Sequence, residues 1–115
     1  MAIKGVFYVY IEVSDLARSK KFYGETLGWQ LGTDEKEVAG FSFGSGYLVM
    51  HGGTKPAPSN SMHVSVQIDN AQEEYERLKG IGLKVSDFYN QPWGEQSFSF
   101  RDPDGHLWYY SQSTR

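Results

Sequence analysis

Three short segments of the chain alternate side chains suited to a core with side chains that can bind a small molecule. Phe7–Val13 has apolar residues at odd positions and phenolic or acidic residues at even positions. His63–Ile68 and His106–Ser111 alternate in the same manner. Successive side chains of a strand point to opposite faces, so each segment predicts one face that could contact a ligand. The residues on these faces are Tyr8, Tyr10, Glu12, His63, Ser65, Gln67, Leu107, Tyr109 and Ser111.

The residue types on these faces favour ligand binding rather than catalysis. Phenol rings offer a large contact area to planar groups, and they add roughly 0.5–2 kcal/mol where a cation is bound. Glu12 would then be the counter-charge, and Glu12 with His63 could also act as an acid–base pair. Trp93 is also a candidate ligand contact, because a tryptophan on a turn is uncommon unless something covers its indole ring. The alternative is that the tyrosines complete a core or a dimer interface.

Several other kinds of site are excluded. The chain has no cysteine, which rules out disulfides, thiolate nucleophiles and cysteine–zinc sites and fits a reducing compartment. It has no Ser/His/Asp arrangement, phosphate-binding loop or dinucleotide fingerprint. A net charge of −3 without a basic face makes nucleic acid a poor partner. No apolar run approaches the roughly 18 residues of a membrane span, and we expect no secretory signal and a cytoplasmic location.

Helix signals follow the first two of these segments. Ser14–Asp15 supplies N-cap chemistry for a helix near Leu16–Leu27. One of the two residues Asp69–Asn70 can cap a second helix near Ala71–Lys79. Glycines lie where each helix is expected to end. Further strands are expected near residues 29–32, 39–43 and 47–51 after the first helix, and near 83–88, 96–100 and 106–111 after the second.

The order of one strand, one helix and three strands therefore occurs twice. The repeats run over about residues 6–52 and 61–112, and residues 52–60, rich in proline and glycine, form the linker. We predict an α+β fold in a single domain, residues 1–115, in which two βαβββ repeats form curled sheets around a cleft. Such a cleft would gather side chains from several facing strands, which suits ligand binding.

Three local motifs follow one another along nearly the whole chain. They are Val13–Leu16 with Ser19, Phe22–Tyr23 and Leu27–Trp29; His63 with Ile68–Asn70; and the tight turn Asp102–Gly105. In this order they resemble the vicinal-oxygen-chelate superfamily, which includes glyoxalase I, extradiol dioxygenases, and the fosfomycin and bleomycin resistance proteins. The resemblance implies the same two-repeat fold and a small-molecule ligand.

Metal-using members of that superfamily carry two ligands per repeat, chosen from His, Glu and occasionally Gln. Carried over through the motifs, three of these positions are Tyr8, His63 and Tyr109. The remaining position is Met50, or His51 if the strand is shifted by one residue. Neutral phenols and thioethers are poor ligands for a divalent ion, and a catalytic site needs about three protein ligands. We therefore expect no metal and no other cofactor.

The turn around Trp93, followed by the Asp102–Gly105 motif, most resembles the bleomycin-resistance branch. Proteins of that branch are dimers that sequester a drug without turnover, and a tryptophan in this region often lines their pocket. We therefore predict an antibiotic-resistance-like homodimer that binds a small molecule, rather than an enzyme. The alternative is a metal-dependent, glyoxalase-like lyase or dioxygenase. The predicted ligand contacts are Tyr8, Tyr10, Glu12, Met50, His63, Ser65, Trp93 and Tyr109.

Overall fold

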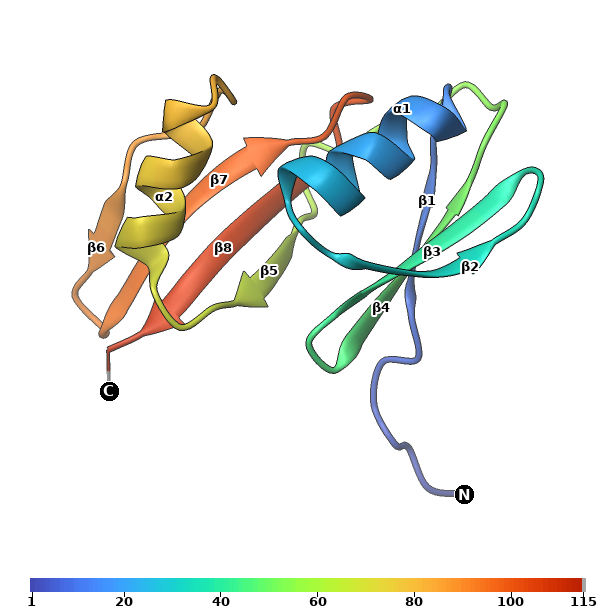
Figure 1. Cartoon of the computed structure of the whole chain (residues 1–115). Helices are drawn as coiled ribbons and strands as arrows, with labels where there is room; N and C mark the ends of the chain where they lie inside the picture. Colours follow the sequence, from blue (N-terminus) through green and yellow to red (C-terminus); the bar gives the residue numbers. More distant parts are fainter. Residues whose placement is uncertain (115) are drawn as a thin grey trace. The chain divides into compact units, whose positions relative to one another are not determined.

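The chain forms two compact units, Met1–Ala57 and Pro58–Arg115. A computed structural model describes residues 1–114. Each unit has its own four-stranded sheet, with helix on one face of it (Figure 1). Within residues 1–114, no helix has the length and apolar character needed to cross a membrane.

The first unit holds the first sheet, in the strand order β1-β4-β3-β2. Strand β1 runs parallel to β4, and the other neighbours are antiparallel. The elements are β1 (Val9–Glu12), α1 (Leu16–Lys21), η1 (Phe22–Thr26), β2 (Gln30–Asp34), β3 (Val38–Phe43) and β4 (Gly46–His51).

The second unit repeats this plan in the second sheet, in the order β5-β8-β7-β6. Strand β5 is parallel to β8, and the other pairs are again antiparallel. The prediction of an α+β fold with two βαβββ repeats is therefore confirmed. The elements are β5 (Val64–Gln67), α2 (Ala71–Gly80), β6 (Tyr89–Gln91), β7 (Glu95–Arg101) and β8 (Leu107–Ser113).

A helix is present at the first predicted position, but its second half is a π-helix. Asp15 caps α1, because its Oδ1 accepts a hydrogen bond from the backbone N–H of Arg18 at 3.1 Å. In η1 the N–H of Leu27 reaches the carbonyl of Phe22 at 2.9 Å, one residue further than in an α-helix. Gly28, at φ 76°, then ends the helix in the left-handed conformation.

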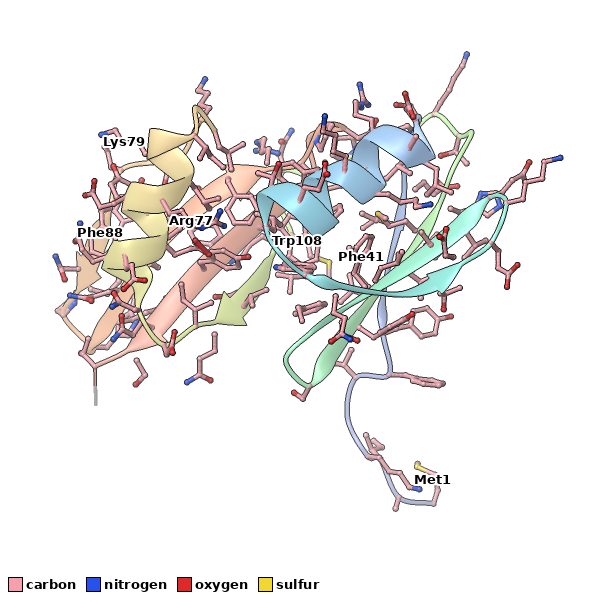
Figure 2. All side chains as sticks on the ribbon, viewed as in Figure 1. Met1, Phe41, Arg77, Lys79, Phe88 and Trp108 are labelled. Carbon is pink, nitrogen blue, oxygen red and sulfur yellow. The ribbon has the colours of Figure 1, made fainter. Side chains whose placement is uncertain are left out.

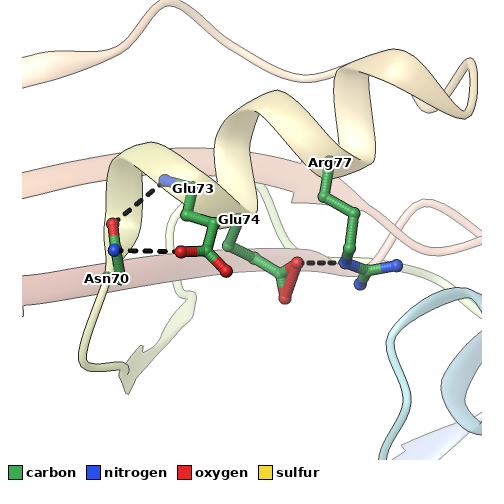
Figure 3. A network of polar contacts seen from close by, with 4 residues as sticks. All are labelled: Asn70, Glu73, Glu74 and Arg77. Carbon is green, nitrogen blue, oxygen red and sulfur yellow. Dashed lines mark hydrogen bonds and ion pairs between the residues drawn. The ribbon is translucent and has the colours of Figure 1, made fainter.

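Asn70, rather than Asp69, caps α2 (Figure 3). Its Oδ1 accepts a hydrogen bond from the N–H of Glu73 at 3.1 Å, and its Nδ2 donates to the Glu73 carboxylate at 3.2 Å. On the next turn Glu74 accepts a hydrogen bond from Arg77, and this bond raises the pKa of the guanidinium above its ordinary value. The start of the helix is thus fixed by side-chain groups that satisfy otherwise unpaired backbone N–H groups.

The helix-covered face of each sheet carries the core of its unit. Aromatic rings dominate both cores, and two of them, Phe41 and Trp108, are labelled in Figure 2. The rings of Phe98 and Tyr110 meet edge to face, with their centroids 5.8 Å apart. The fully buried apolar residues are Val13, Tyr23, Ala39, Leu48 and Met50 in the first unit, and Ala71, Leu78 and Phe98 in the second.

The strand predicted over residues 83–88 is wrong. This segment makes only an isolated bridge between Val85 and Phe100, and strand β6 follows it in the chain. Beside the bridge, a side chain replaces a backbone group of the ladder, since Oγ of Ser86 accepts the N–H of Ser99 at 2.8 Å. Regular strand pairing begins only at β6, which pairs with β7 next to the turn that joins them.

Candidate ligand-binding site

The open face of each sheet, meaning the face opposite the helix of its own unit, carries most of the predicted ligand contacts. On the first sheet, Tyr10 is paired in register with Val49, and Glu12 with His51. Paired residues of neighbouring strands point to the same side. Tyr10, with 52% of its surface exposed, and Glu12 therefore share the open face with His51. Tyr8 lies just before β1, half exposed, with its ring edge-on to that of Phe7.

The prediction that Met50 faces a ligand is wrong. Met50 is paired with Ile11 on the helix-covered face and is 0% exposed. The shifted register that would bring His51 to the open face is the one observed. The Nε2 atom of His51 lies 4.0 Å from a carboxylate oxygen of Glu37.

The open face of the first sheet also holds a residue that the sequence analysis missed, Tyr47. Its hydroxyl accepts a hydrogen bond from the N–H of Thr33 at 2.8 Å and shares another, also 2.8 Å, with the Thr33 hydroxyl. The ring lies so close to Gly40 that a Cβ there would be 2.3 Å from the hydroxyl oxygen. Strand alternation puts Tyr47 on the same face as His51. Tyr47 could therefore have been predicted only if the register of β4 had been known.

The open face of the second sheet is lined with hydroxyl groups. Ser65 is paired with Tyr109 across β5 and β8, and its Oγ shares a 2.6 Å hydrogen bond with that of Ser111. The His63 ring lies against the Tyr109 ring, with their centroids 4.2 Å apart. The structure therefore brings these four side chains together, as the alternation predicted for this strand pair.

A hollow of about 390 Å³ lies at the end of this face nearest the β6–β7 turn. We call it the Trp93 hollow. Trp93 is 56% exposed, and its Nε1 donates a 2.9 Å hydrogen bond to Oε2 of Glu95. Gly94, at φ 86°, allows the tight turn beside the indole. The residues that line the hollow are Ser65, Gln67, Trp93, Gly94, Glu95, Ser111 and Ser113.

Apart from the buried Met50, the predicted residues thus fall into three groups. Ser65 and Trp93 share the Trp93 hollow, while His63 and Tyr109 stack beside Ser65 on the same face. Glu95 was missed, although its alternation with the other odd-numbered residues of β7 would have placed it on this face. The remaining predicted contacts, Tyr8, Tyr10 and Glu12, belong to the first unit.

The donors on these faces do not fit the metal that the metal-using relatives carry. With the observed register, the carried-over positions are Tyr8, His51, His63 and Tyr109, which supply two phenols and two imidazoles. Catalytic divalent sites usually need three imidazole or carboxylate ligands. Across residues 1–114, no group of three or more His, Asp or Glu side chains is arranged to hold a metal ion. These side chains therefore do not make a catalytic metal site of that kind.

Comparisons with known proteins agree with this fold. The solved antibiotic-binding protein TnmS3 from Streptomyces sp. CB03234 is 28% identical, with 98% of each chain covered and a TM-score of 0.84. The fosfomycin resistance protein FosX from Listeria monocytogenes is 21% identical, with coverages of 98% of this chain and 96% of that chain and a TM-score of 0.85. A lactoylglutathione lyase from Agrobacterium tumefaciens is 16% identical, with coverages of 97% and 96% and a TM-score of 0.80. At such identities the last two likenesses concern the fold alone.

A family model described as the Glyoxalase/Bleomycin resistance protein/Dioxygenase superfamily matches residues 5–110. The match includes every helix and strand except the last three residues of β8. It confirms the resemblance that the three sequence motifs predicted. The protein therefore belongs to the Glyoxalase/Bleomycin resistance protein/Dioxygenase superfamily.

Proposed function

We propose that the protein binds a small organic molecule at the Trp93 hollow by contacts that need no metal ion. The observation that carries this proposal is the half-exposed indole of Trp93, held over the hollow by its hydrogen bond to Glu95. An indole in water leaves a large apolar surface uncovered, and covering such surface is favourable by about 25 cal/mol per Å². A planar ring laid against Trp93 would gain this energy.

The other side chains of the hollow favour a ligand that donates hydrogen bonds. Ser65, Ser111 and Ser113 offer hydroxyls, and Gln67 offers an amide. A carboxylate can accept several hydrogen bonds, so Glu95 keeps acceptor capacity beyond its bond to Trp93. An amine on a planar framework matches this set, because the described residues that line the hollow include one carboxylate and no Lys or Arg.

The likeness to TnmS3 supports an antibiotic or a similar drug-like molecule as the ligand. TnmS3 is described as an antibiotic-binding protein, and its sequence is 28% identical to this chain over almost the full length of both. A protein of this kind would protect by sequestering the molecule, without chemical turnover. We propose the same mode of action here.

We also propose ligand contacts outside the Trp93 hollow. His63 and Tyr109 stack beside Ser65 and would extend the aromatic surface on the second sheet. Tyr8, Tyr10 and Glu12 remain predicted contacts on the first unit. Each can be tested by its own alanine variant once a ligand is known.

A screen of planar, amine-bearing antibiotics by thermal shift, followed by calorimetry on the hits, would test the proposal. Trp93→Ala should abolish binding while leaving the melting temperature nearly unchanged, because the side chain is half exposed. Ile81→Ala, which removes an exposed apolar side chain at the end of α2, is the matched control. If the hits bind Trp93→Ala and the control equally well, the Trp93 hollow is not the site.

The competing function is a metal-dependent lyase or dioxygenase. The observation in its favour is the register of β4, which puts His51 rather than Met50 on the open face, beside Glu12. Elemental analysis of protein purified without chelators separates the two functions. Stoichiometric nickel, zinc, manganese or iron, lost on replacing His51 and His63 by alanine, would overturn metal-independent binding.

We further propose that the protein is a homodimer. Strand β1 is at the edge of its sheet, and the segment before it exposes the large apolar side chains of Met1, Ile3, Val6 and Phe7. An open sheet edge next to exposed apolar residues favours pairing with another chain. Light scattering across a dilution series should give the mass of two chains, and deletion of residues 1–7 should give one. A monomer at every concentration would contradict the proposal.

A further inference from the structure

A second hollow of about 400 Å³ lies on the second unit, and we call it the Lys84–Arg101 hollow. Ser99 of β7 and Tyr109 of β8 line it, so it opens on the same face as the Trp93 hollow. Arg101 lies at the opposite end of β7 from Glu95. Of the residues considered so far as possible ligand contacts, Leu107 and Tyr109 belong to it.

The two hollows have opposite charge. Among residues 1–114, Lys84 and Arg101 line the second hollow without any Asp or Glu, although the chain as a whole has a net charge of −3. Within the same part of the chain, the Trp93 hollow is lined by the carboxylate of Glu95 and by no Lys or Arg. A pair of cations without a carboxylate between them attracts an anion.

A backbone carbonyl close by in the chain orients the Arg101 side chain. Its Nη1 donates a hydrogen bond to the carbonyl of Gly105 at 2.7 Å. A guanidinium has five N–H donors in a planar fork, so this bond leaves donors for a ligand. Leu83 and Leu107 line the same hollow and give it apolar walls beside the two cations.

The charged ends of the face are too far apart to serve one small ligand. Glu95 and Arg101 are six residues apart on β7, and a strand rises about 3.3 Å per residue, so their backbones are separated by about 20 Å. The Lys84–Arg101 hollow is therefore a site of its own.

We propose that the Lys84–Arg101 hollow binds an organic carboxylate, whose charged group pairs with Lys84 and Arg101 while its apolar part contacts Leu83 and Leu107. This site is separate from the Trp93 hollow, and it takes a ligand of opposite charge. Binding at either hollow does not require a ligand in the other.

The probe for this site is 2-naphthoate, and the neutral control ligand of the same shape is 2-naphthamide. In ¹H–¹⁵N spectra of the full chain, naphthoate should shift the amides of Ser86, Ser99 and Leu107 and leave the indole N–H of Trp93 in place. Naphthamide should bind at least about tenfold more weakly, because it cannot form the charge-assisted bonds. Raising the salt concentration should weaken naphthoate binding and not naphthamide binding.

Lys84→Gln with Arg101→Gln should weaken naphthoate binding by about tenfold or more. The matched control removes two exposed lysines elsewhere, by Lys36→Gln with Lys55→Gln, and should bind like the wild type. Lys84→Gln alone keeps the Arg101–Gly105 bond, so it separates loss of charge from loss of local structure.

The proposal is overturned if naphthoate and naphthamide bind equally, if both double variants bind alike, or if millimolar naphthoate shifts none of the three amides. These outcomes are independent of the Trp93 hollow, whose ligands would shift the Trp93 indole instead. An amine ligand that moves the indole while naphthoate fails would leave the proposed function intact and remove only this inference.

Discussion

The hydroxyl of Tyr47 on β4 accepts the backbone N–H of Thr33 on β2 across 2.8 Å, bridging over the strand between them. The bridge reaches β2 where its pairing with β3 is irregular, between Leu31 and Asp34. A side chain thereby provides a partner for a backbone group at the point where the ladder is interrupted.

Replacing Tyr47 by phenylalanine should lower the free energy of unfolding by about 0.5–1.5 kcal/mol, since it removes both hydrogen bonds to Thr33 while keeping the ring. Urea denaturation followed by circular dichroism measures the change. Tyr89→Phe, at a half-exposed ring of the second unit, is the control and should leave stability nearly unchanged. Equal stability of Tyr47→Phe and wild type would mean that water replaces the Thr33 bond without cost.

Replacing Gly40 by alanine should destabilise the first unit by about 1–3 kcal/mol, because the new methyl group would overlap the Tyr47 ring. Gly80→Ala is the matched control, since a Cβ there meets nothing within 4 Å. Combining Gly40→Ala with Tyr47→Ala removes the overlap, so the double variant should lose less than the sum of the single losses. Strict additivity would show that the overlap does not determine the cost.

The register of β4 predicts opposite effects for two neighbouring residues. Met50→Ala should cost about 2–5 kcal/mol of stability, because Met50 is fully buried in the core. His51→Ala should change stability by less than about 0.5 kcal/mol, because that side chain faces outward and is half exposed. Thermal unfolding of the two variants side by side measures both effects. A larger loss from His51→Ala would contradict the observed register.

Replacing Asn70 by alanine should cost about 0.5–2 kcal/mol, because the first turn of α2 loses its cap. Asp69→Ala is the control, and its effect should be close to zero if Asn70 alone caps the helix. Hydrogen exchange of the amides of residues 71–75 should accelerate in the first variant only. Similar exchange in both variants would show that the two residues share the capping role.

Replacing Glu95 by glutamine keeps an oxygen acceptor for the Trp93 indole and removes the charge of the Trp93 hollow. Under the proposed function, amine ligands should bind about tenfold more weakly, and neutral planar ligands should be unaffected. Isothermal titration calorimetry measures the binding of both classes. If both classes weaken equally, Glu95 acts by orienting Trp93 rather than by its charge.

The strand faces were predictable from the sequence because alternation is a local property. Tyr10, Glu12, Ser65, Tyr109 and Ser111 all lie on the faces that alternation gave them. The helix at 71–79 was also predictable, since the cap before it and the glycines after it are encoded within one segment. Only the choice between Asp69 and Asn70 required the structure.

The register of β4 was not predictable, because it depends on the length of a turn. The first unit closes its last hairpin with two residues, since Phe43 is paired with Gly46. The second uses five, since Arg101 is paired with Leu107. Matching Gly46 to Gly105 therefore aligned β4 with β8 out of step by an odd number of residues. Such a shift moves every side chain to the other face, so Met50 was placed on the wrong face.

All strand pairing within residues 1–114 stays inside one unit or the other, and residues 52–60 connect the two. Each sheet is therefore built from one continuous stretch of the chain, and an insertion in this connection should break no ladder hydrogen bond in either sheet.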